Sequence, residues 1–397
     1  MNEVAPQSAI STSDRIRRFL WLLAPLLVLA ITIAWIAAAD PLKNFNNGAP
    51  PVEAVTFERT VLNSAGMQFQ IRAGGSEAMT VAQVQVDDAY WMFTMTPAGP
   101  LARGSTAWIS IAYPWVLGEA HRIKIVTQTG TTFEHEIAVA VPTPEATQGQ
   151  LQQQAIVGAI VGILPVAIGL MFYPAMRGIG ATGMSFVLAL TVGLLTFLLV
   201  DMTFEALELA AEAAAIFQGQ AMVLLAALST FLLLMAIGRR AGRPEGIALA
   251  SYIAIGIGLH NFGEGLAIGA AFAAGSAGLG TFLVLGFAIH NVTEGIGIAA
   301  PMVRNRPSLW VFVALTLLAG APAVLGMWLG SLSYAPQWSA LALGVGAGAI
   351  LQVMVEVTSY FLRTTRQEGK YWLTLPVLSG FLIGVAFMYV TAALIKV

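Results

Sequence analysis

The sequence predicts an all-α polytopic membrane protein: an eight-helix bundle plus one N-terminal transmembrane anchor, carrying a small all-β sandwich domain outside the membrane. Three observations lead to this fold class. Hydrophobic residues make up 57% of the 397 residues and charged residues only 10%, whereas soluble domains average about 25% charged residues. Nine apolar runs are long enough to span a bilayer. One polar stretch, between the first two runs, alternates in hydrophobicity as β-strands do.

The first apolar run is interpreted as an uncleaved anchor. Residues 1–18 are polar and end in three arginines, Arg15, Arg17 and Arg18. Residues 19–39 are apolar, and a signal-peptide core has only about 7–15 apolar residues, whereas a span needs about 20. The arginines place the N-terminus in the cytoplasm. Cleavage after the small residues Ala37 to Ala39 is the alternative.

Residues 40–141 are expected to form the sandwich. Segments such as Val81 to Val86 and Arg122 to Thr127 alternate between apolar and polar residues, and clusters of Gly, Pro and Ser separate them. Residues 142–154 have the composition of a linker. A compact domain outside the membrane, joined to the bundle by this linker, is therefore predicted.

Two of the four histidines, His121 and His135, belong to the sandwich. His135 lies between Glu134 and Glu136, which makes it a metal-ligand candidate. Alternation along a strand, however, puts the imidazole and the two carboxylates on opposite faces. An ordinary solvated strand is therefore the favoured interpretation.

Residues 155–397 are expected to form the bundle of eight spans. These lie approximately at 155–176, 183–204, 219–238, 247–273, 279–303, 308–330, 338–362 and 371–396. The basic residues between them fall in the segments that a cytoplasmic N-terminus places inside: Arg177, Arg239, Arg240, Arg243, Arg304, Arg306, Arg363, Arg366 and Lys370. This distribution follows the positive-inside rule. It predicts a bacterial inner-membrane protein with residues 40–154 and the C-terminus extracytoplasmic.

A near-repeated polar motif interrupts the fourth and fifth of these spans. His260 to Gly265 (HNFGEG) and His290 to Gly295 (HNVTEG) start 30 residues apart. On a helix, residues three and four positions apart share a face. The two spans are antiparallel and both motifs fall near mid-depth, so six side chains are expected to converge: His260, Asn261, Glu264, His290, Asn291 and Glu294.

Ionisable groups at membrane depth are costly and usually functional. Imidazole and carboxylate ligands suit divalent ions such as Zn²⁺, Fe²⁺ or Mn²⁺. The structural alternative is a pair of satisfied polar contacts between helices. Two copies of the same triplet on neighbouring spans favour a metal site over that alternative.

Acidic residues elsewhere in the spans are expected to serve the same path. Asp201, Glu205, Glu208 and Glu212 recur at helical spacing at the outer end of the second span, and Glu356 is the one acid of the seventh. A solvated helix end accounts equally well for Glu205, Glu208 and Glu212. An acidic mouth concentrates cations, so a role in entry is expected for Asp201 and Glu205 and an accessory role for Glu356.

Composition excludes several other classes. The chain has no cysteine, which excludes disulfides, iron–sulfur clusters and thiolate metal sites. Its net charge of −2 argues against a nucleic-acid partner. An intramembrane metalloprotease needs His-Glu-x-x-His, and this pattern does not occur in the sequence. The expected partners are lipid and metal ions, and a homodimer is compatible with the sequence.

At the paired motif the chain resembles the ZIP (Zrt/Irt-like) metal-ion transporters, most closely the bacterial branch, whose fourth and fifth helices read His-Asn-x-Pro-Glu-Gly. The resemblance covers residues 155–397. It implies a transporter, not an enzyme, that carries divalent metals to the cytoplasm, zinc foremost, with iron, manganese and cadmium as further cargo. By this likeness the six motif residues match the family's metal ligands. Asp201, Glu205 and Glu356 match acidic positions of its second and seventh helices.

The chain departs from the family pattern in three places. Gly263 and Thr293 replace the proline of the two motifs, and Ala321 stands where the sixth helix of the family has a metal-bridging Glu. One ligand of a second ion is therefore missing. The anchor and the sandwich are not part of the usual family pattern. These departures leave a transport-deficient metal sensor or scaffold as the alternative function.

Overall fold

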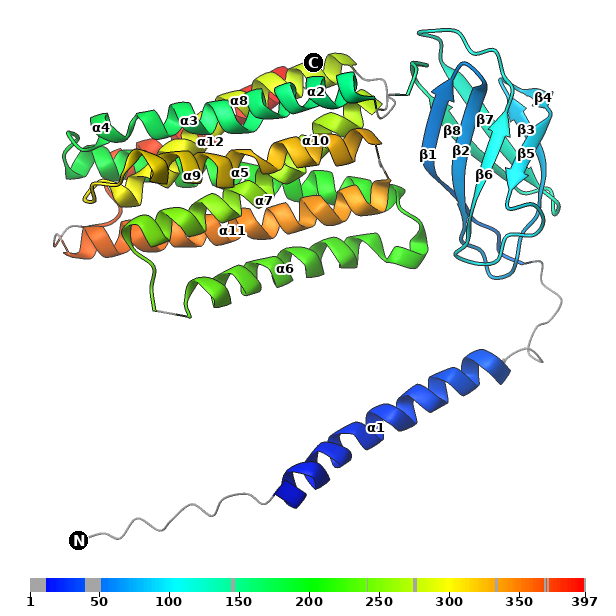
Figure 1. Ribbon diagram of the computed structural model, residues 1–397, viewed down its shortest axis with the longest axis horizontal. Helices are drawn as coiled ribbons and strands as arrows, with labels where there is room; N and C mark the ends of the chain where they lie inside the picture. The colour runs from blue at the N-terminus through cyan, green and yellow to red at the C-terminus, as the bar shows by residue number, and fades with distance from the viewer. Residues whose placement is uncertain are drawn as a thin grey trace. The chain divides into compact units, whose positions relative to one another are not determined.

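The computed structural model describes residues 12–39, 51–143, 147–240, 242–273, 277–332, 335–367, 369 and 371–395. The chain divides into two compact units, Met1–Pro51 and Val52–Val397, and each is described by itself. Long apolar helices and two small antiparallel sheets make up the described part of the chain (Figure 1). The predicted fold class is therefore confirmed.

The first unit contains helix α1 (Thr12–Ala39). Its segment Phe19–Ile36 is long and apolar enough to cross a membrane. Large apolar side chains such as Trp21 and Ile33 are exposed along it, which suits a helix surrounded by lipid. Residues 1–11 and 40–50 lie outside the described residues.

The second unit begins with a β-sandwich of two four-stranded antiparallel sheets, in the orders β1-β2-β6-β5 and β4-β3-β7-β8. The strands are β1 Val55–Asn63, β2 Gly66–Ala73, β3 Val81–Val86, β4 Ala89–Trp91, β5 Phe93–Thr96, β6 Thr106–Ile111, β7 His121–Thr127 and β8 Thr132–Ile137. Alternate side chains point inward, so Phe69, Ile71, Ile109 and Ile125 are fully buried between the sheets. The alternating segments found in the sequence are thus strands of this core.

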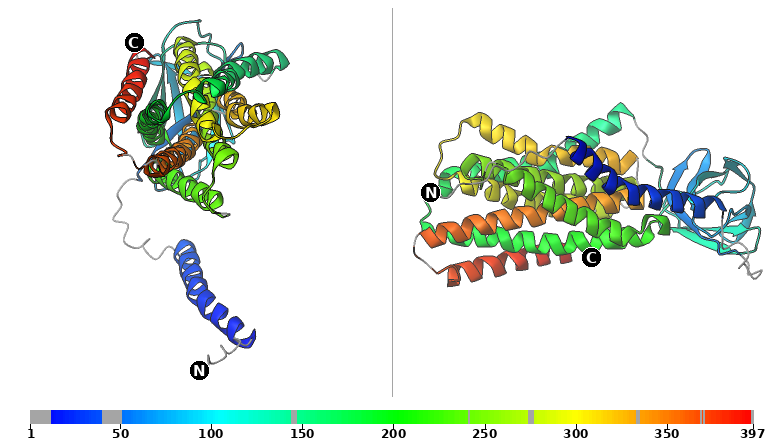
Figure 2. Two further views of the ribbon diagram at one scale, coloured as in Figure 1. Left: turned by 90° about the vertical axis from the view of Figure 1, so that its left-hand side faces the viewer. Right: turned by 90° about the horizontal axis from the view of Figure 1, so that it is seen from below.

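The rest of the second unit is a bundle of long helices that run roughly side by side (Figure 2). Its elements are α2 Gln148–Gly158, η2 Ala159–Ile163, α3 Leu164–Met171, α4 Tyr173–Met176, α5 Ala181–Glu212, η3 Ala215–Phe217, α6 Gly219–Gly238, α7 Gly246–Ala273, α8 Ala277–Ala299, η4 Ala300–Met302, α9 Leu309–Gly320, α10 Pro322–Leu332, α11 Pro336–Gln367 and α12 Leu375–Ile395. Eight helical segments among the described residues, α1 included, are long and apolar enough to cross a membrane. Of these eight, α7 and α11 are the most buried.

The bundle begins earlier in the chain than the sequence predicts. A linker is expected over residues 142–154, whereas α2 starts at Gln148. Thr147 caps this helix, because its Oγ1 accepts a hydrogen bond from Gln150 N (3.3 Å). Trp328 Nε1 also donates to Leu151 O (2.9 Å). The first turns of α2 are rich in polar residues, as linkers are. The cap at Thr147 nevertheless stabilises a helix there.

Two of the expected spans are interrupted next to prolines. The first contains the π-helical turn η2 immediately before α3, whose second residue is Pro165. The sixth divides at Ala321 into α9 and α10, and α10 begins at Pro322. Proline has no N–H and cannot complete the i→i−4 hydrogen bond. Both interruptions therefore leave backbone carbonyls available to other partners.

Small residues let the helices that carry the motifs pack closely on their neighbours. A Cβ added at Gly326 of α10 would overlap Phe262 O of α7, and one added at Gly265 would overlap Ala323 O. On α8, a Cβ added at Gly295 would overlap Val166 O of α3. The glycine that ends each motif is therefore required for close helix packing: Gly265 lets α7 contact α10, and Gly295 lets α8 contact α3.

Within the second unit the sandwich contacts the ends of several helices of the bundle, and a buried carboxylate takes part in this contact. Glu58 of β1, 3% exposed, accepts hydrogen bonds from Arg72 (2.6 and 3.1 Å) and from Gln337 Nε2 of α11 (3.1 Å). Arg72 also lies over the ring of Phe217 at 5.1 Å. The pairing of β1 with β2 shifts register between Phe57 and Arg59, which is a β-bulge at Glu58. The bulge thus accompanies the contact between sandwich and bundle.

Gly326→Ala is expected to destabilise the protein by about 1–3 kcal/mol, because the added methyl group overpacks the α7–α10 contact. The melting temperature in nanodiscs measures this effect. Gly149→Ala on α2 is the matched control, since nothing lies within 4 Å of a Cβ there. Alanine has the higher helix propensity, so the control should melt at the same or a higher temperature. Equal melting of the two variants would contradict close packing at Gly326.

The strand that carries His135 is largely exposed, as expected, but His135 itself is half-buried and packs against the facing sheet of the sandwich. Its ring stacks on Phe57 (4.8 Å between centroids), and its Nε2 lies 3.0 Å from Thr60 Oγ1. Burial lowers the pKa of His135 below its ordinary value. The two flanking glutamates are exposed. His135 and the two glutamates therefore lie on opposite faces of β8, as predicted. The face of His135 is turned towards Phe57 and Thr60.

Because the pKa of His135 is lowered in the folded protein, the folded state favours the neutral ring. The contribution of the neutral ring to stability is therefore complete above about pH 6.5. That contribution declines as the pH falls from this value towards the folded pKa. Hydrogen exchange of β1 and β8 amides, corrected for intrinsic rates, should therefore accelerate between pH 7.5 and pH 5.5. In His135→Gln, which can still bond Thr60, this pH effect should be smaller. An equal pH effect in the wild type and in His135→Gln would be evidence against a half-buried neutral imidazole at position 135.

Candidate metal centre

The two polar triplets lie on α7 and α8 and are brought together as the sequence predicts. On each helix, i, i+1 and i+4 spacing places the three side chains on neighbouring parts of one face. All six are buried, none more than 3% exposed: His260, Asn261, Glu264, His290, Asn291 and Glu294. The helices α7 and α8 are continuous through the motifs, so Gly263 and Thr293 in place of proline allow unbroken helices.

Glu264 is the point where the two triplets meet. Its Oε1 lies 2.6 Å from His290 Nε2 and 3.0 Å from His260 Nε2. Its Oε2 accepts a hydrogen bond from Asn291 Nδ2 (3.2 Å). A carboxylate of α7 thus contacts both imidazoles and one amide, two of these three groups coming from α8.

Three residues with the spacing of metal ligands lie around this carboxylate. One ligand atom from each of His260, His290 and Glu294 lies within 4.8 Å of the other two. His260 Nε2 is 3.6 Å from Glu294 Oε1. Tetrahedral zinc ligands at about 2.1 Å from the ion are roughly 3.4 Å apart, so small side-chain shifts suffice to bind one ion. Among the described residues this is the cluster with the chemistry of a divalent-metal site.

Several atoms of the centre have no hydrogen-bond partner within the described part of the chain. They are both carboxylate oxygens of Glu294, the amide oxygens of Asn261 and Asn291, and both ring nitrogens of His260. The short approach of His260 to Glu264 lacks hydrogen-bond geometry. Buried polar atoms without partners are unfavourable. Most of these atoms are acceptors, and a cation would satisfy several of them at once.

Residues 241–392 match the family model of the ZIP zinc transporters. The matched segment contains α7 to α11 and most of α12, including both motifs. It covers less than half of the chain and does not include α1 or the sandwich. The family that this segment matches consists of metal-ion transporters, and the match agrees with the resemblance carried by the two motifs. No curated protein matches the chain.

Each asparagine of the centre is anchored to a carbonyl next to a helix interruption. Asn291 Nδ2 donates to Val161 O (3.0 Å) in η2. Pro165 stands four residues after Val161 and has no N–H to offer that oxygen. Asn261 Nδ2 donates to Ala319 O (2.9 Å), in the last turn of α9 before Pro322. Sequence reasoning missed these contacts, and the two prolines were the available signal.

Ala321 occupies the junction between α9 and α10. Neither helix contains an acidic residue, so the sixth span offers no carboxylate to the centre. The missing ligand noted in the sequence is not replaced by a neighbour on the same span.

Asp201 and Glu205 reach the edge of the centre. They lie on α5 and line a cavity of about 20 Å³ together with His260 and Glu264. This volume has room for one water molecule. The structure therefore brings the two predicted entry residues to the same small space as two of the predicted ligands.

Glu356 is buried in an ion pair instead. Its Oε1 lies 3.2 Å from Arg239 Nη2 at the end of α6, and its side chain is 4% exposed against 38% for the arginine. One turn before it on α11, Gln352 approaches Gly256 of α7, which precedes His260 by one turn. Glu356 is thus separated from His260 by one turn of α11 and one turn of α7. The spacing of acids along the sequence did not indicate this arginine partner.

Neither sandwich histidine belongs to a metal-binding group of three among the described residues. His121 Nδ1 lies 2.8 Å from Asp87 Oδ2, and Asp87 also accepts a hydrogen bond from Tyr113 (3.0 Å). His135 contacts Thr60 and Phe57 as described above. Among the described residues, the group with the spacing of metal ligands is therefore the one on α7 and α8.

Asn291→Ala is expected to lower stability by about 1–3 kcal/mol, because it leaves Val161 O buried without a donor. Adding Pro165→Ala supplies an N–H four residues after Val161, so the double variant should recover part of the loss. Chemical unfolding in detergent micelles measures both effects. Asn261→Ala is the matched control, since its partner is Ala319 and Pro165→Ala should not rescue it. Equal rescue of both asparagine variants would refute the anchoring role.

Proposed function

We propose that the protein is a permease that moves divalent metal cations, zinc foremost, across a bacterial inner membrane into the cytoplasm. The observation that carries this proposal is the buried group of His260, His290 and Glu294, whose ligand atoms lie within 4.8 Å of one another. Such a group in a membrane-spanning bundle has no structural purpose that apolar side chains would not serve better.

The proposed ligands are the six motif residues, with a different part for each type. His260 and Glu294 offer atoms without hydrogen bonds, and His290 offers the ring nitrogen that contacts Glu264. Glu264 exchanges its contacts with the two histidines for the ion, and the asparagine oxygens complete the shell while their amide nitrogens stay bonded to Ala319 and Val161. A thiolate-free set of nitrogen and oxygen ligands accepts several ions, so Fe²⁺, Mn²⁺ and Cd²⁺ are further cargo.

The proposed route enters at Asp201 and Glu205. A hydrated cation approaching these carboxylates reaches the small cavity that they share with His260 and Glu264, and loses water to the ligands there. The proposed direction is supported by the arginines at the ends of α6 and α11, because the positive-inside rule favours a cytoplasmic location for them. The Arg239–Glu356 ion pair (3.2 Å) then lies at the exit side, with the N-terminus inside and residues 40–154 and the C-terminus outside.

The proposed centre holds one ion rather than two, because α9 and α10 carry no carboxylate at Ala321. The same observation supports a second candidate function, a metal sensor or scaffold that binds an ion without transporting it. The two candidates share the ligand set and differ in whether the ion crosses the membrane.

Uptake of radioactive zinc into proteoliposomes tests the proposal. His260→Ala and Glu294→Ala should each reduce the initial rate about tenfold or more, because each removes a metal ligand. Glu208→Ala is the matched control, since Glu208 is exposed on α5 and does not line the centre. It should keep the wild-type rate.

Equilibrium zinc binding, measured on the same preparations, separates the candidate functions. Binding without uptake in the wild type would favour the sensor, and uptake that is unchanged in both ligand variants would refute the assigned site. Melting temperatures of the variants show whether a loss of uptake reflects unfolding.

A further inference from the structure

A cavity apart from the metal centre lies where the sandwich meets the helix ends. It has a volume of about 350 Å³ and is lined by residues of β1, β8, the segment after β8 and the ends of α5, α10 and α11. Ligand sites for small molecules have volumes of about 300–1,000 Å³ and mostly apolar walls with a few polar groups. This cavity has such walls, formed by Phe57, Leu62, Val139, Val141 and Pro336.

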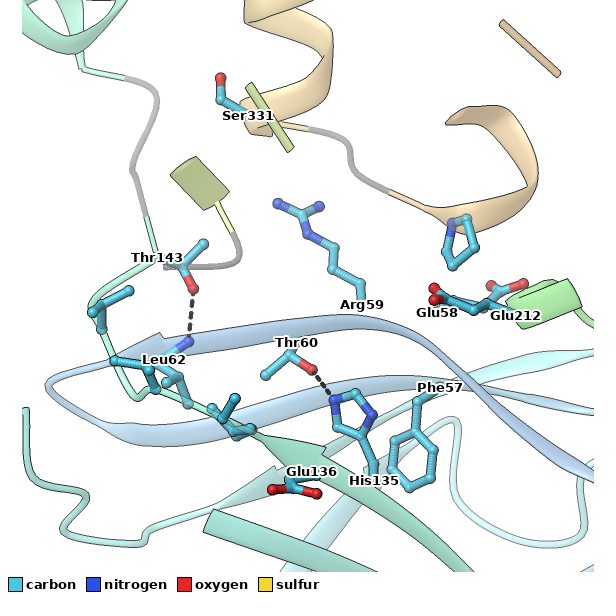
Figure 3. Close-up of a pocket in the computed structure, with 15 residues that line it drawn as sticks. Phe57, Glu58, Arg59, Thr60, Leu62, His135, Glu136, Thr143, Glu212 and Ser331 are labelled. Atoms are coloured by element: carbon cyan, nitrogen blue, oxygen red, sulfur yellow. Dashed lines mark hydrogen bonds between the residues drawn. The ribbon is translucent and has the colours of Figure 1, made fainter. Parts of the chain in front are cut away.

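Three charged side chains of both signs line the cavity without forming ion pairs to described residues, namely Arg59, Glu136 and Glu212. Arg59 of β1 projects into the space between the strand and the helix ends, and Glu212 lies at the end of α5 (Figure 3). Within the described residues neither makes an ion pair or a hydrogen bond, whereas the neighbouring Glu58 is held by Arg72 and Gln337. Arg59 is half-buried, and a half-buried guanidinium without a partner is a ready site for a carboxylate.

The arrangement of charge narrows the chemistry of the ligand. A bare divalent cation is repelled by the unpaired Arg59, and a simple anion is repelled by Glu212 and by Glu136, which also lines the cavity. A molecule with a carboxylate at one end, an ammonium group near it and an apolar side chain satisfies both charges and the walls.

We infer that this cavity binds a small apolar α-amino acid, with its carboxylate on Arg59, its ammonium group towards Glu212 and its side chain against Phe57 and Leu62. The β-bulge at Glu58 supports this assignment. The pairing of β1 with β2 shifts register between Phe57 and Arg59. Because of this shift, two adjacent residues have different roles: Glu58 contacts α11 and Arg59 lines the cavity. The site is independent of metal transport.

Binding of radioactive L-leucine to the full chain in nanodiscs tests this inference, with L-valine and L-phenylalanine as competitors of other sizes. The analogue without the amine, 4-methylpentanoate, and the analogue without the carboxylate, 3-methylbutylamine, should each compete about tenfold less well than L-leucine, because each loses one charged contact. Arg59→Gln and Glu212→Gln should each weaken leucine binding by a similar factor.

Matched controls are Arg103→Gln on the sandwich surface and Glu208→Gln one turn earlier on α5, neither of which lines the cavity. Both should bind leucine as the wild type does, and melting temperatures confirm that all variants are folded. Absence of binding for all three amino acids at millimolar concentration would overturn the inference. So would equal competition by 4-methylpentanoate, which indicates an anion site, or displacement of leucine by zinc alone, which indicates a cation site.

Discussion

Polar atoms buried at membrane depth need partners, and this requirement shapes the bundle around α7 and α8. Lipid offers none, so each donor and acceptor must find one within the protein. Glu264 meets the need with the imidazole of His290 and the amide of Asn291, and the asparagine nitrogens meet it with Val161 O and Ala319 O. What remains is a surplus of acceptors, concentrated on Glu294 and the amide oxygens. A cation bound at the centre would give these unpaired oxygen atoms a partner.

The interruptions in the first and sixth spans belong to the same arrangement. Helices at membrane depth normally satisfy their own backbones, and a proline leaves a carbonyl over. In this chain Val161 O, four residues before Pro165, receives the amide group of Asn291 and is the carbonyl that this proline leaves over. Asn261 donates to Ala319 O, the neighbour of the carbonyl of Leu318 that Pro322 leaves over. Each motif asparagine is therefore oriented by a neighbouring helix close to a proline.

Sequence reasoning predicted the elements that depend on local pattern and missed those that depend on contact between distant segments. Apolar runs and charge asymmetry identified the spans, and the repeat of His, Asn and Glu identified which residues of α7 and α8 would meet. The polar start of α2 was read as a linker because its helix depends on a cap at Thr147 and on Trp328. The Arg239 partner of Glu356 and the packing of His135 on Phe57 likewise join residues far apart in the chain, and one sequence does not reveal such pairs.

The glycine contacts have a mechanical meaning. Gly265 and Gly326 join α7 to α10, and Gly295 joins α8 to α3, in each case backbone against backbone. Two helices held this closely cannot slide along or turn against each other without collision. The same kind of contact joins the first span to the sixth, where a Cβ added at Gly162 of η2 would overlap Gly320 O of α9. The helices that carry the six motif side chains are therefore fixed to one another through α3, η2, α9 and α10, and the centre is held in one rigid frame.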